Sequence, residues 1–181
     1  MMGKSKKEPG KDTDLNSPSF FMKKALLLAQ KAYDLDETPI GAMIVKDGKI
    51  LSTGYNLREI KQDVTLHAEM IAVRKACKKL GSWRLDNCDI YVTLEPCIMC
   101  ASVIQQSKIN KVYFGAYEPK GGGIVSKACI LDITLNHNVQ YEGGILADES
   151  SELLKSFFTS MRVKDKATGL SKGERRLRNK N

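Results

Sequence analysis

Two short strings in the middle of the chain place the strongest constraint on its fold. The first is His67-Ala68-Glu69 and the second is Pro96-Cys97-Ile98-Met99-Cys100. Each stands where an apolar pattern with helical spacing begins, so each is predicted to open a helix. Two cysteines three positions apart lie on one helix face, and both can reach a single metal ion. We therefore expect a fold that brings the starts of two helices together.

His67, Cys97 and Cys100 would supply one nitrogen and two sulfur ligands. Three protein ligands with an open fourth position are typical of a catalytic zinc site, whereas a structural zinc site is usually closed by four. The other candidates for a fourth ligand are His137, Cys77, Cys88 and Cys129. Their spacing does not call for a closed site, although the sequence alone leaves one open. We expect the three remaining cysteines to be small buried side chains, with no disulfide.

Glu69 stands two positions after His67, which is about 200° around a helix axis. It is therefore poorly placed as a fourth ligand if the helix runs alongside the metal. If the helix start points at the metal, Glu69 flanks the open position instead, where a carboxylate can carry protons. We expect three zinc ligands and, in Glu69, a separate catalytic acid and base.

The rest of the sequence predicts alternating helices and strands. Ser17-Pro18 is typical of a helix start, and Asp47-Gly48 between two strand-like runs predicts a hairpin. A strand, a helix and a strand in succession around Cys97 indicate a parallel crossover. The expected helices are 18–34, 66–80, 97–107 and 148–161, and the expected strands are 40–46, 49–55, 89–94 and 111–115, with short pieces in 129–146. The predicted fold class is α/β, a three-layer α/β/α domain with a central mixed sheet.

The sequence divides into a flexible lead-in at 1–16, one domain at 17–161 and a basic tail at 162–181. Of the net charge of +8, the tail carries +6, from eight Lys or Arg and two acidic residues. Such a tail either binds nucleic acid through phosphates or is simply solvated. No apolar run approaches the roughly 20 residues that cross a bilayer. The first residues also lack the apolar core of a secretory signal, so we expect a cytoplasmic protein without a membrane partner.

Over residues 38–161 the chain resembles the bacterial tRNA-specific adenosine deaminases, within the cytidine and deoxycytidylate deaminase superfamily. The two zinc strings together are common to zinc deaminases. Two strings point more narrowly to the tRNA enzymes. They are Thr93-Leu94-Glu95-Pro96-Cys97, and Gly144-Ile145-Leu146-Ala147-Asp148-Glu149 at the entry to a final helix that carries Phe157-Phe158. The other matching strings are Pro39-Ile40-Gly41-Ala42, Gly54-Tyr55-Asn56 and Val112-Tyr113-Phe114-Gly115-Ala116.

The resemblance implies a cytidine-deaminase-like fold, one Zn²⁺ per subunit and a homodimer. It also implies hydrolysis of adenosine to inosine, with release of ammonia, at the wobble position of a tRNA anticodon arm; an arginine tRNA is expected. Carried over by position, Asn56 would bind the purine and Leu94 would line the base pocket. Glu118, Lys120 and Phe158 are further expected substrate-binding residues. In the loop that follows Val112-Tyr113-Phe114-Gly115-Ala116, Glu118 stands where the family usually has a shorter Asp, and Pro119 comes next.

Two other functions stay open on the sequence. A deaminase of small molecules, such as guanine, cytosine or a nucleoside, would share the zinc strings, although the basic tail and the Phe157-Phe158 helix favour tRNA. A zinc-stabilised RNA-binding protein without catalysis would need a fourth zinc ligand. It would have no use for Glu69.

Overall fold

The structure, a computed structural model, describes residues 16–133 and 135–169 of the chain. Its centre is a five-stranded sheet in the order β2-β1-β3-β4-β5. β1 is antiparallel to β2 and β3, whereas β3, β4 and β5 run parallel, so the predicted mixed sheet is confirmed. The strands are β1 (Gly41–Lys46), β2 (Lys49–Tyr55), β3 (Cys88–Leu94), β4 (Lys111–Ala116) and β5 (Gln140–Glu142).

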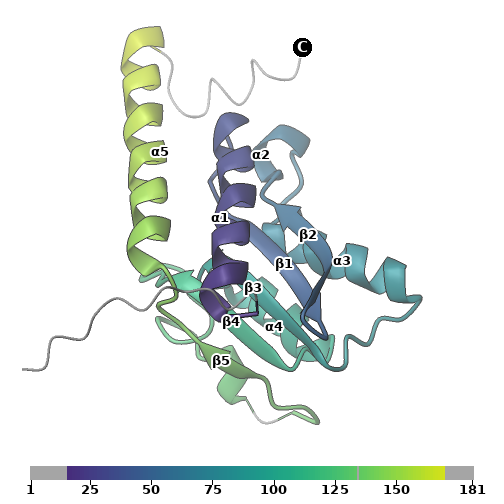
Figure 1. Cartoon of the computed structure of the whole chain (residues 1–181). Helices are drawn as coiled ribbons and strands as arrows, with labels where there is room; N and C mark the ends of the chain where they lie inside the picture. The colour runs from purple at the N-terminus through teal and green to yellow at the C-terminus, as the bar shows by residue number, and fades with distance from the viewer. Residues whose placement is uncertain (1–15, 134, 170–181) are drawn as a thin grey trace, which may run out of the picture.

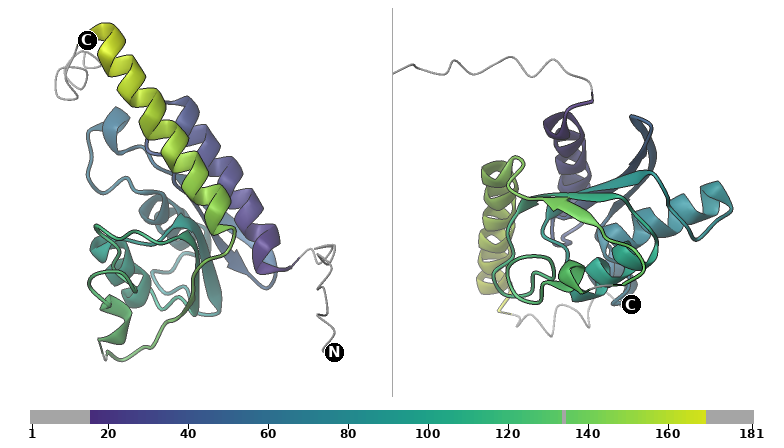
Figure 2. Two further views of the ribbon diagram at one scale, coloured as in Figure 1. Left: turned by 90° about the vertical axis from the view of Figure 1, so that its left-hand side faces the viewer. Right: turned by 90° about the horizontal axis from the view of Figure 1, so that it is seen from below.

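Helices cover both faces of this sheet (Figures 1 and 2). On one face α1 (Pro18–Asp34) and α5 (Ala147–Thr168) lie side by side, and on the other lie α3 (Ala68–Leu80) and α4 (Ile98–Gln106). A short α2 (Arg58–Lys61) and a 3-10 turn, η1 (Ile130–Asp132), lie in the connections. The arrangement is the predicted three-layer α/β/α fold.

The core lies on both sides of the central strand β3. Ile90 and Val92 pack into the cluster under α3 and α4, whereas Tyr91 packs with Phe21 and Met22 under α1. Successive side chains of a strand point to opposite faces, so a strand buried on both sides is apolar almost throughout. This is why Cys88–Leu94 has so little polar character.

The predicted turn and cap residues are found at the element ends. The Ser17 hydroxyl accepts a hydrogen bond from the Phe20 backbone N–H (3.1 Å), and Pro18 follows it in the first turn of α1. Asp47 and Gly48 both have positive φ in the β1–β2 hairpin, and Gly81 ends α3 with φ of +65°. The strand β3, the helix α4 and the strand β4 form the predicted parallel crossover.

Four expectations differ from the structure or fall outside it. The connection 56–66, expected without a helix, contains α2, and the last helix runs past Met161 to Thr168. Cys88 is buried as expected, but Cys77 is only half-buried and Cys129 is exposed. The expectations for residues 1–15 and 170–181 lie outside the described residues. Within the described part, no helix has the length and apolar character needed to span a bilayer.

Candidate metal centre

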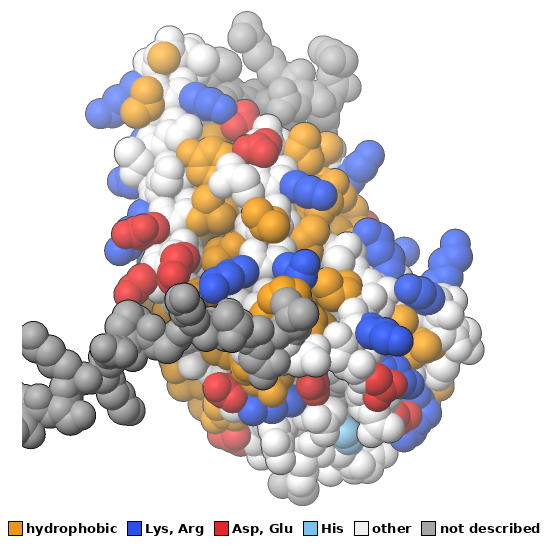
Figure 3. All heavy atoms as spheres, in the orientation of Figure 1, with side chains coloured by type: hydrophobic (Ala, Val, Ile, Leu, Met, Phe, Trp, Pro, Cys, Tyr) orange, Lys and Arg blue, Asp and Glu red, His pale blue; other side chains and the backbone are white. Residues whose placement is uncertain are grey.

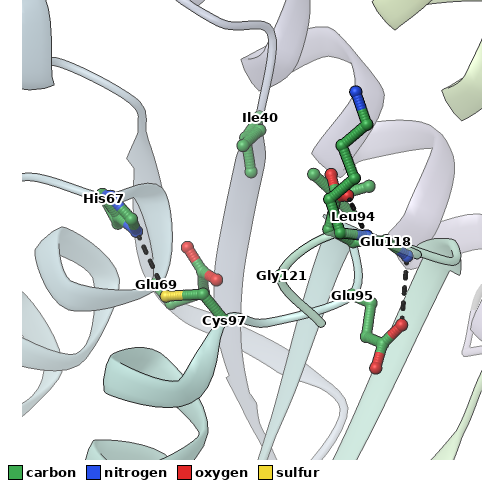
Figure 4. A pocket seen from close by; sticks show the side chains of 9 residues that line it. Ile40, His67, Glu69, Leu94, Glu95, Cys97, Glu118 and Gly121 are labelled. Atoms are coloured by element: carbon green, nitrogen blue, oxygen red, sulfur yellow. Dashed lines mark hydrogen bonds between the residues drawn. The ribbon is translucent and has the colours of Figure 1, made fainter. Parts of the chain in front are cut away.

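The starts of α3 and α4 meet at one point, as the sequence predicts. His67 directly precedes α3 and Cys97 directly precedes α4, and both have an extended backbone. The Nδ1 atom of His67 lies 3.6 Å from the Sγ atoms of both Cys97 and Cys100. The three possible ligand atoms lie within 4.8 Å of one another. Figure 4 shows the imidazole of His67 facing the Cys97 sulfur.

This geometry fits a zinc ion. Zinc–sulfur bonds of about 2.3 Å and zinc–nitrogen bonds of about 2.0 Å in a tetrahedron predict N···S separations of about 3.5 Å. The two observed distances from His67 to the cysteines, both 3.6 Å, are close to that value. Among residues 16–133 and 135–169 no other group of three metal-binding side chains is found. The arrangement of His67, Cys97 and Cys100 therefore fits one Zn²⁺.

No fourth protein ligand completes the site within the described part of the chain. The Nε2 atom of His137 donates a hydrogen bond to the Ile109 carbonyl (2.7 Å), away from the ligand group. Cys88 is fully buried in the core, and Cys129 is exposed. A three-ligand zinc site keeps a position open for water or substrate. The closed site required by a purely structural metal is not formed by these residues.

Close packing of α3 against β2 fixes the position of His67. A Cβ atom on Gly54 would lie 2.2 Å from the Ala68 carbonyl oxygen, so only glycine lets the first turn of α3 approach the strand. Two residues earlier in β2, on the same face, the Ser52 hydroxyl donates a hydrogen bond to the Ala72 carbonyl (2.7 Å). The helix start is therefore held against the sheet at two points.

The ligands favour the thiolate form at one sulfur. Hydrogen bonds from Cys100 and His67 lower the pKa of Cys97 to about 4, although burial opposes the shift. The same hydrogen bond with Cys97, together with burial, raises the pKa of Cys100. A bound divalent cation would overcome the raised pKa of Cys100, because such a cation deprotonates a coordinating thiol outright.

Glu69 is a buried carboxyl group beside this ligand set. Its side chain is 4% exposed, and burial raises its pKa above the ordinary value for glutamate. Its Oε2 atom has no hydrogen-bond partner among the described residues. Leaving a buried polar atom unpaired costs about 1–3 kcal/mol, and such atoms call for an explanation. The carboxyl group points into the pocket next to the ligands (Figure 4).

A cavity of about 320 Å³ lies over the ligands. It brings together most of the site residues that the sequence predicts, including Leu94 at the end of β3 and Glu118 and Lys120 in the loop after β4. In that loop the Glu118 carboxylate accepts a hydrogen bond from the Lys120 backbone N–H (2.9 Å). The lining residues are Ile40, His67, Glu69, Leu94, Glu95, Cys97, Glu118, Lys120 and Gly121.

Two expected substrate-binding residues do not line this cavity. Asn56 is buried behind Ile40, where its backbone N–H donates to the Ile40 carbonyl (3.0 Å) and its Nδ2 donates to Glu37 (2.9 Å). Phe158 lies on α5, 44% exposed, with its ring edge against Phe157. Asn56 is thus next to the pocket wall, whereas Phe158 belongs to a separate surface.

Three lining residues were not predicted: Ile40, Glu95 and Gly121. Glu95 left a signal in the sequence, because it is an acidic residue directly after an apolar strand. Burial by itself would raise its pKa, but hydrogen bonds from Ser126, Val125 and Glu118 lower it below the ordinary value. The carboxylate is therefore charged although it is buried.

Comparison with known proteins shows that the sequence and the fold are similar to those of a group of deaminases. The family model of the cytidine and deoxycytidylate deaminase zinc-binding region matches residues 15–116. A tRNA-specific adenosine deaminase from Aquifex aeolicus is 48% identical over 144 residues, which cover 79% of this chain and 95% of that protein.

Two solved structures are similar in sequence as well as in fold. One, from work on A-to-I editing by tRNA:A34 deaminases at the wobble position, is 42% identical with a TM-score of 0.71. The match covers 74% of this chain and 98% of the chain in that structure. The other is a guanine deaminase from Bacillus subtilis, also 42% identical, with a TM-score of 0.52. The match covers 54% of this chain and 62% of the chain in that structure.

Proposed function

Because this chain belongs to the family of tRNA-specific adenosine deaminases, we propose that it converts adenosine to inosine at the wobble position of a tRNA anticodon. An arginine tRNA is the proposed substrate. The observation that carries the chemistry is the buried Glu69 carboxyl group, with one unpaired oxygen, beside a three-ligand zinc site. A structural metal site has no need of such a group.

Glu69 is the proposed catalytic residue. Zinc in a site with an open position lowers the pKa of a water molecule towards 7 and so provides a nucleophile at neutral pH. Glu69 would take one proton from the attacking water and pass it to N1 of the adenine, while the water oxygen adds to C6. It would then take the second proton from the new hydroxyl group on C6 and give it to the amino group, so that the C–N bond breaks, C6 keeps the oxygen as a carbonyl, and ammonia leaves. The raised pKa of this carboxyl group suits a group that must both take and give a proton.

The substrate-binding residues are proposed from their places around the cavity. Leu94 would contact the base, with Glu118 and Lys120 beside the flanking nucleotides. Asn56, held by Glu37 behind the pocket wall, is the proposed hydrogen-bond partner of the purine. An exposed aromatic ring can stack on an unpaired base, so Phe158 is proposed to contact the anticodon loop outside the cavity.

A homodimer in the cytoplasm is the proposed working form. Exposed apolar side chains flank both helix starts that carry the zinc ligands: Ile60 and Val64 precede α3, and Ile98 opens α4. Covering them against a second copy would bury apolar area close to the site. The compartment follows from the substrate, since tRNA is found in the cytoplasm. Light scattering of the purified protein at micromolar concentration would give the mass of the assembly.

The experiment that tests this function compares substrates. The zinc-loaded protein is incubated separately with arginine tRNA carrying an ACG anticodon, the same tRNA with GCG, and free adenosine, guanine and cytidine. We expect ammonia and inosine from the ACG tRNA alone. Ammonia only from the free compounds would contradict the tRNA assignment and favour a small-molecule deaminase. That second candidate is supported by the similarity to the guanine deaminase structure over about half of this chain.

A further inference from the structure

Glu95 occupies an unusual position between the sheet and the metal site. It follows the last residue of β3, and its backbone N–H donates to the Ala116 carbonyl (2.8 Å), which continues the pairing of β3 with β4. Its side chain is only 2% exposed. Cys97, a zinc ligand, stands two positions further on. Figure 4 shows the Glu95 carboxylate directed away from the Cys97 sulfur and towards the loop that carries Glu118.

The partners of this carboxylate come from one loop. Its Oε1 accepts hydrogen bonds from the backbone N–H groups of Ile124 (3.2 Å), Val125 (2.7 Å) and Ser126 (2.9 Å). Its Oε2 accepts one from the Glu118 N–H (3.0 Å) and another from the Ser126 hydroxyl. None of the ion pairs found among the described residues includes Glu95. A buried charge without a cation is tolerable only when hydrogen bonds replace its hydration, as these do.

The loop wraps closely around the carboxylate. A Cβ atom on Gly122 would lie 2.4 Å from the carboxyl carbon of Glu95 and 2.5 Å from both oxygens. The next residue, Gly123, donates its N–H to the Pro96 carbonyl (2.7 Å), and Gly122 forms a strand-like bridge with Cys97. The segment 118–126 is therefore fastened to the residues just before α4.

We propose that Glu95 is a positioning residue, whose buried carboxylate fixes loop 118–126 over the cavity and thereby sets how tightly the tRNA substrate is held. This rests on the proposed function for the identity of the substrate. Glu118, Lys120 and Gly121 form one wall of the cavity, and they belong to the fastened loop. Glu95 does not need to touch the reacting atoms, because it acts through the loop.

The main test is Glu95→Gln in the full-length, zinc-loaded protein. Glutamine has nearly the same shape but offers one accepting oxygen instead of two, and its amide nitrogen cannot accept from the Glu118 or Ser126 donors. A loosened loop weakens the binding of the substrate and of its transition state alike, which raises KM and leaves kcat unchanged. We expect KM for the ACG tRNA to rise about tenfold or more, with kcat within about threefold and the zinc content unchanged.

Hydrogen exchange measures the loop without depending on any activity. In Glu95→Gln the backbone amides of 118–126 should exchange faster, while those of β3 and α3 keep their protection. A matched control is Glu142→Gln, a carboxylate at the sheet edge that pairs with Lys111 (2.8 Å) and does not line the cavity. It should change neither KM nor exchange in the loop. Unchanged exchange and unchanged KM in Glu95→Gln would overturn the proposal.

Two further variants decide the matter if Glu95→Gln fails to fold or loses zinc. Ser126→Ala removes one of the hydrogen bonds, and Gly122→Ala presses a methyl group against the intact carboxylate. Both variants should raise KM and speed hydrogen exchange in 118–126. Wild-type KM and wild-type exchange in both variants would refute the proposal that Glu95 fixes this loop. If the wild-type protein does not act on tRNA at all, the proposed function fails. The exchange data still show whether Glu95 holds the loop.

Discussion

Three buried glutamates, Glu37, Glu69 and Glu95, carry carboxyl groups in the interior of this small domain. Glu37 accepts hydrogen bonds from Asn56 and from the Ile60 backbone, and Glu95 accepts them from its loop. Glu69 alone keeps an unpaired oxygen. An unsatisfied buried group lowers stability, so its presence next to the metal ligands indicates a site shaped for chemistry rather than for stability.

Replacing the Glu69 carboxyl group should separate catalysis from metal binding. We expect Glu69→Gln to lower kcat by about 10²–10⁴-fold, because general acid and base catalysis contributes an effect of that size. Zinc content should stay at one per subunit, since the three ligands are untouched. The measurement is single-turnover deamination together with metal analysis. Near-normal turnover in this variant would contradict a catalytic role for Glu69.

Glu37 should make the stability of the protein depend on pH. Burial raises its pKa above the ordinary value of 4.5, against the opposing effect of the Ile60 hydrogen bond, with smaller and opposite contributions from nearby Glu59 and Arg58. The folded protein therefore holds this proton more tightly than the unfolded chain does. Its stabilising contribution is full below pH 4.5 and is lost as the pH rises through the folded pKa.

The variant Glu37→Gln removes this titration. We expect the difference in unfolding free energy between wild type and variant to shrink as the pH rises from 4.5 towards neutrality. Urea unfolding at a series of pH values measures it. A difference that grows with pH would mean that the hydrogen bonds from Asn56 and Ile60 outweigh the effect of burial.

At the residue scale, the sequence predicts the zinc ligands because sulfur and imidazole groups at fixed spacing are visible in it. The partners of Glu37 and Glu95 are mostly backbone N–H groups from distant segments. Every residue except proline has such a group, so a sequence cannot mark which of them will face a carboxylate. This is why the anchoring role of Glu95 becomes visible only in the folded chain.

At the scale of elements, the contact between α3 and β2 determines where the first zinc ligand lies. Gly54→Ala would place a methyl group against the Ala68 backbone and push the helix start away from the strand. We expect a loss of at least about 1–3 kcal/mol in unfolding free energy, as for other overpacked sites, and weaker zinc binding. Gly121→Ala is the control for stability, because nothing lies within 4 Å of its Cβ position. Equal stability of the two variants would argue against the tight contact.

Helices and strands with a clear apolar pattern lie within two residues of their predicted bounds, with one exception at the end of α5. The unpredicted α2 has four residues, none of them buried, so no periodicity marks it. Glu37 supports it by accepting from the Ile60 N–H (2.7 Å). α5 continues past Met161 as a mostly exposed helix until Gly169, and in this part Lys164 forms an ion pair with Asp36 (2.5 Å). Apolar periodicity shows where a helix is buried, and it does not show where a solvated helix ends.

At the scale of the whole molecule, positive charge is the feature that suits an RNA substrate. The chain carries a net charge of +8, and Lys and Arg side chains gather over the β2 and α3 side of the view in Figure 3. Phosphate contacts make nucleic-acid binding weaken steeply as salt rises. A deaminase of free bases would show little of this dependence, because its substrates are uncharged.

Removing residues 170–181 tests what the basic end of the chain contributes. The deletion takes away five Lys or Arg residues and one Glu. We expect tRNA affinity to fall and the slope of log affinity against log salt to become shallower by roughly one unit per lost phosphate contact. kcat at saturating tRNA should not change. An unaltered salt slope would mean that these residues are only a solvated extension.

The anchoring of loop 118–126 by Glu95 has a consequence for how such an enzyme can be redirected. Four of the five groups that the carboxylate holds are backbone amides, which are the same whatever side chains the loop carries. Gly122 and Gly123 have no room for a side chain, and Ser126 supplies the fifth hydrogen bond, so these positions are constrained. We expect that side chains elsewhere in the loop can be changed to suit another nucleotide context without loss of the contacts that hold the loop beside the metal site.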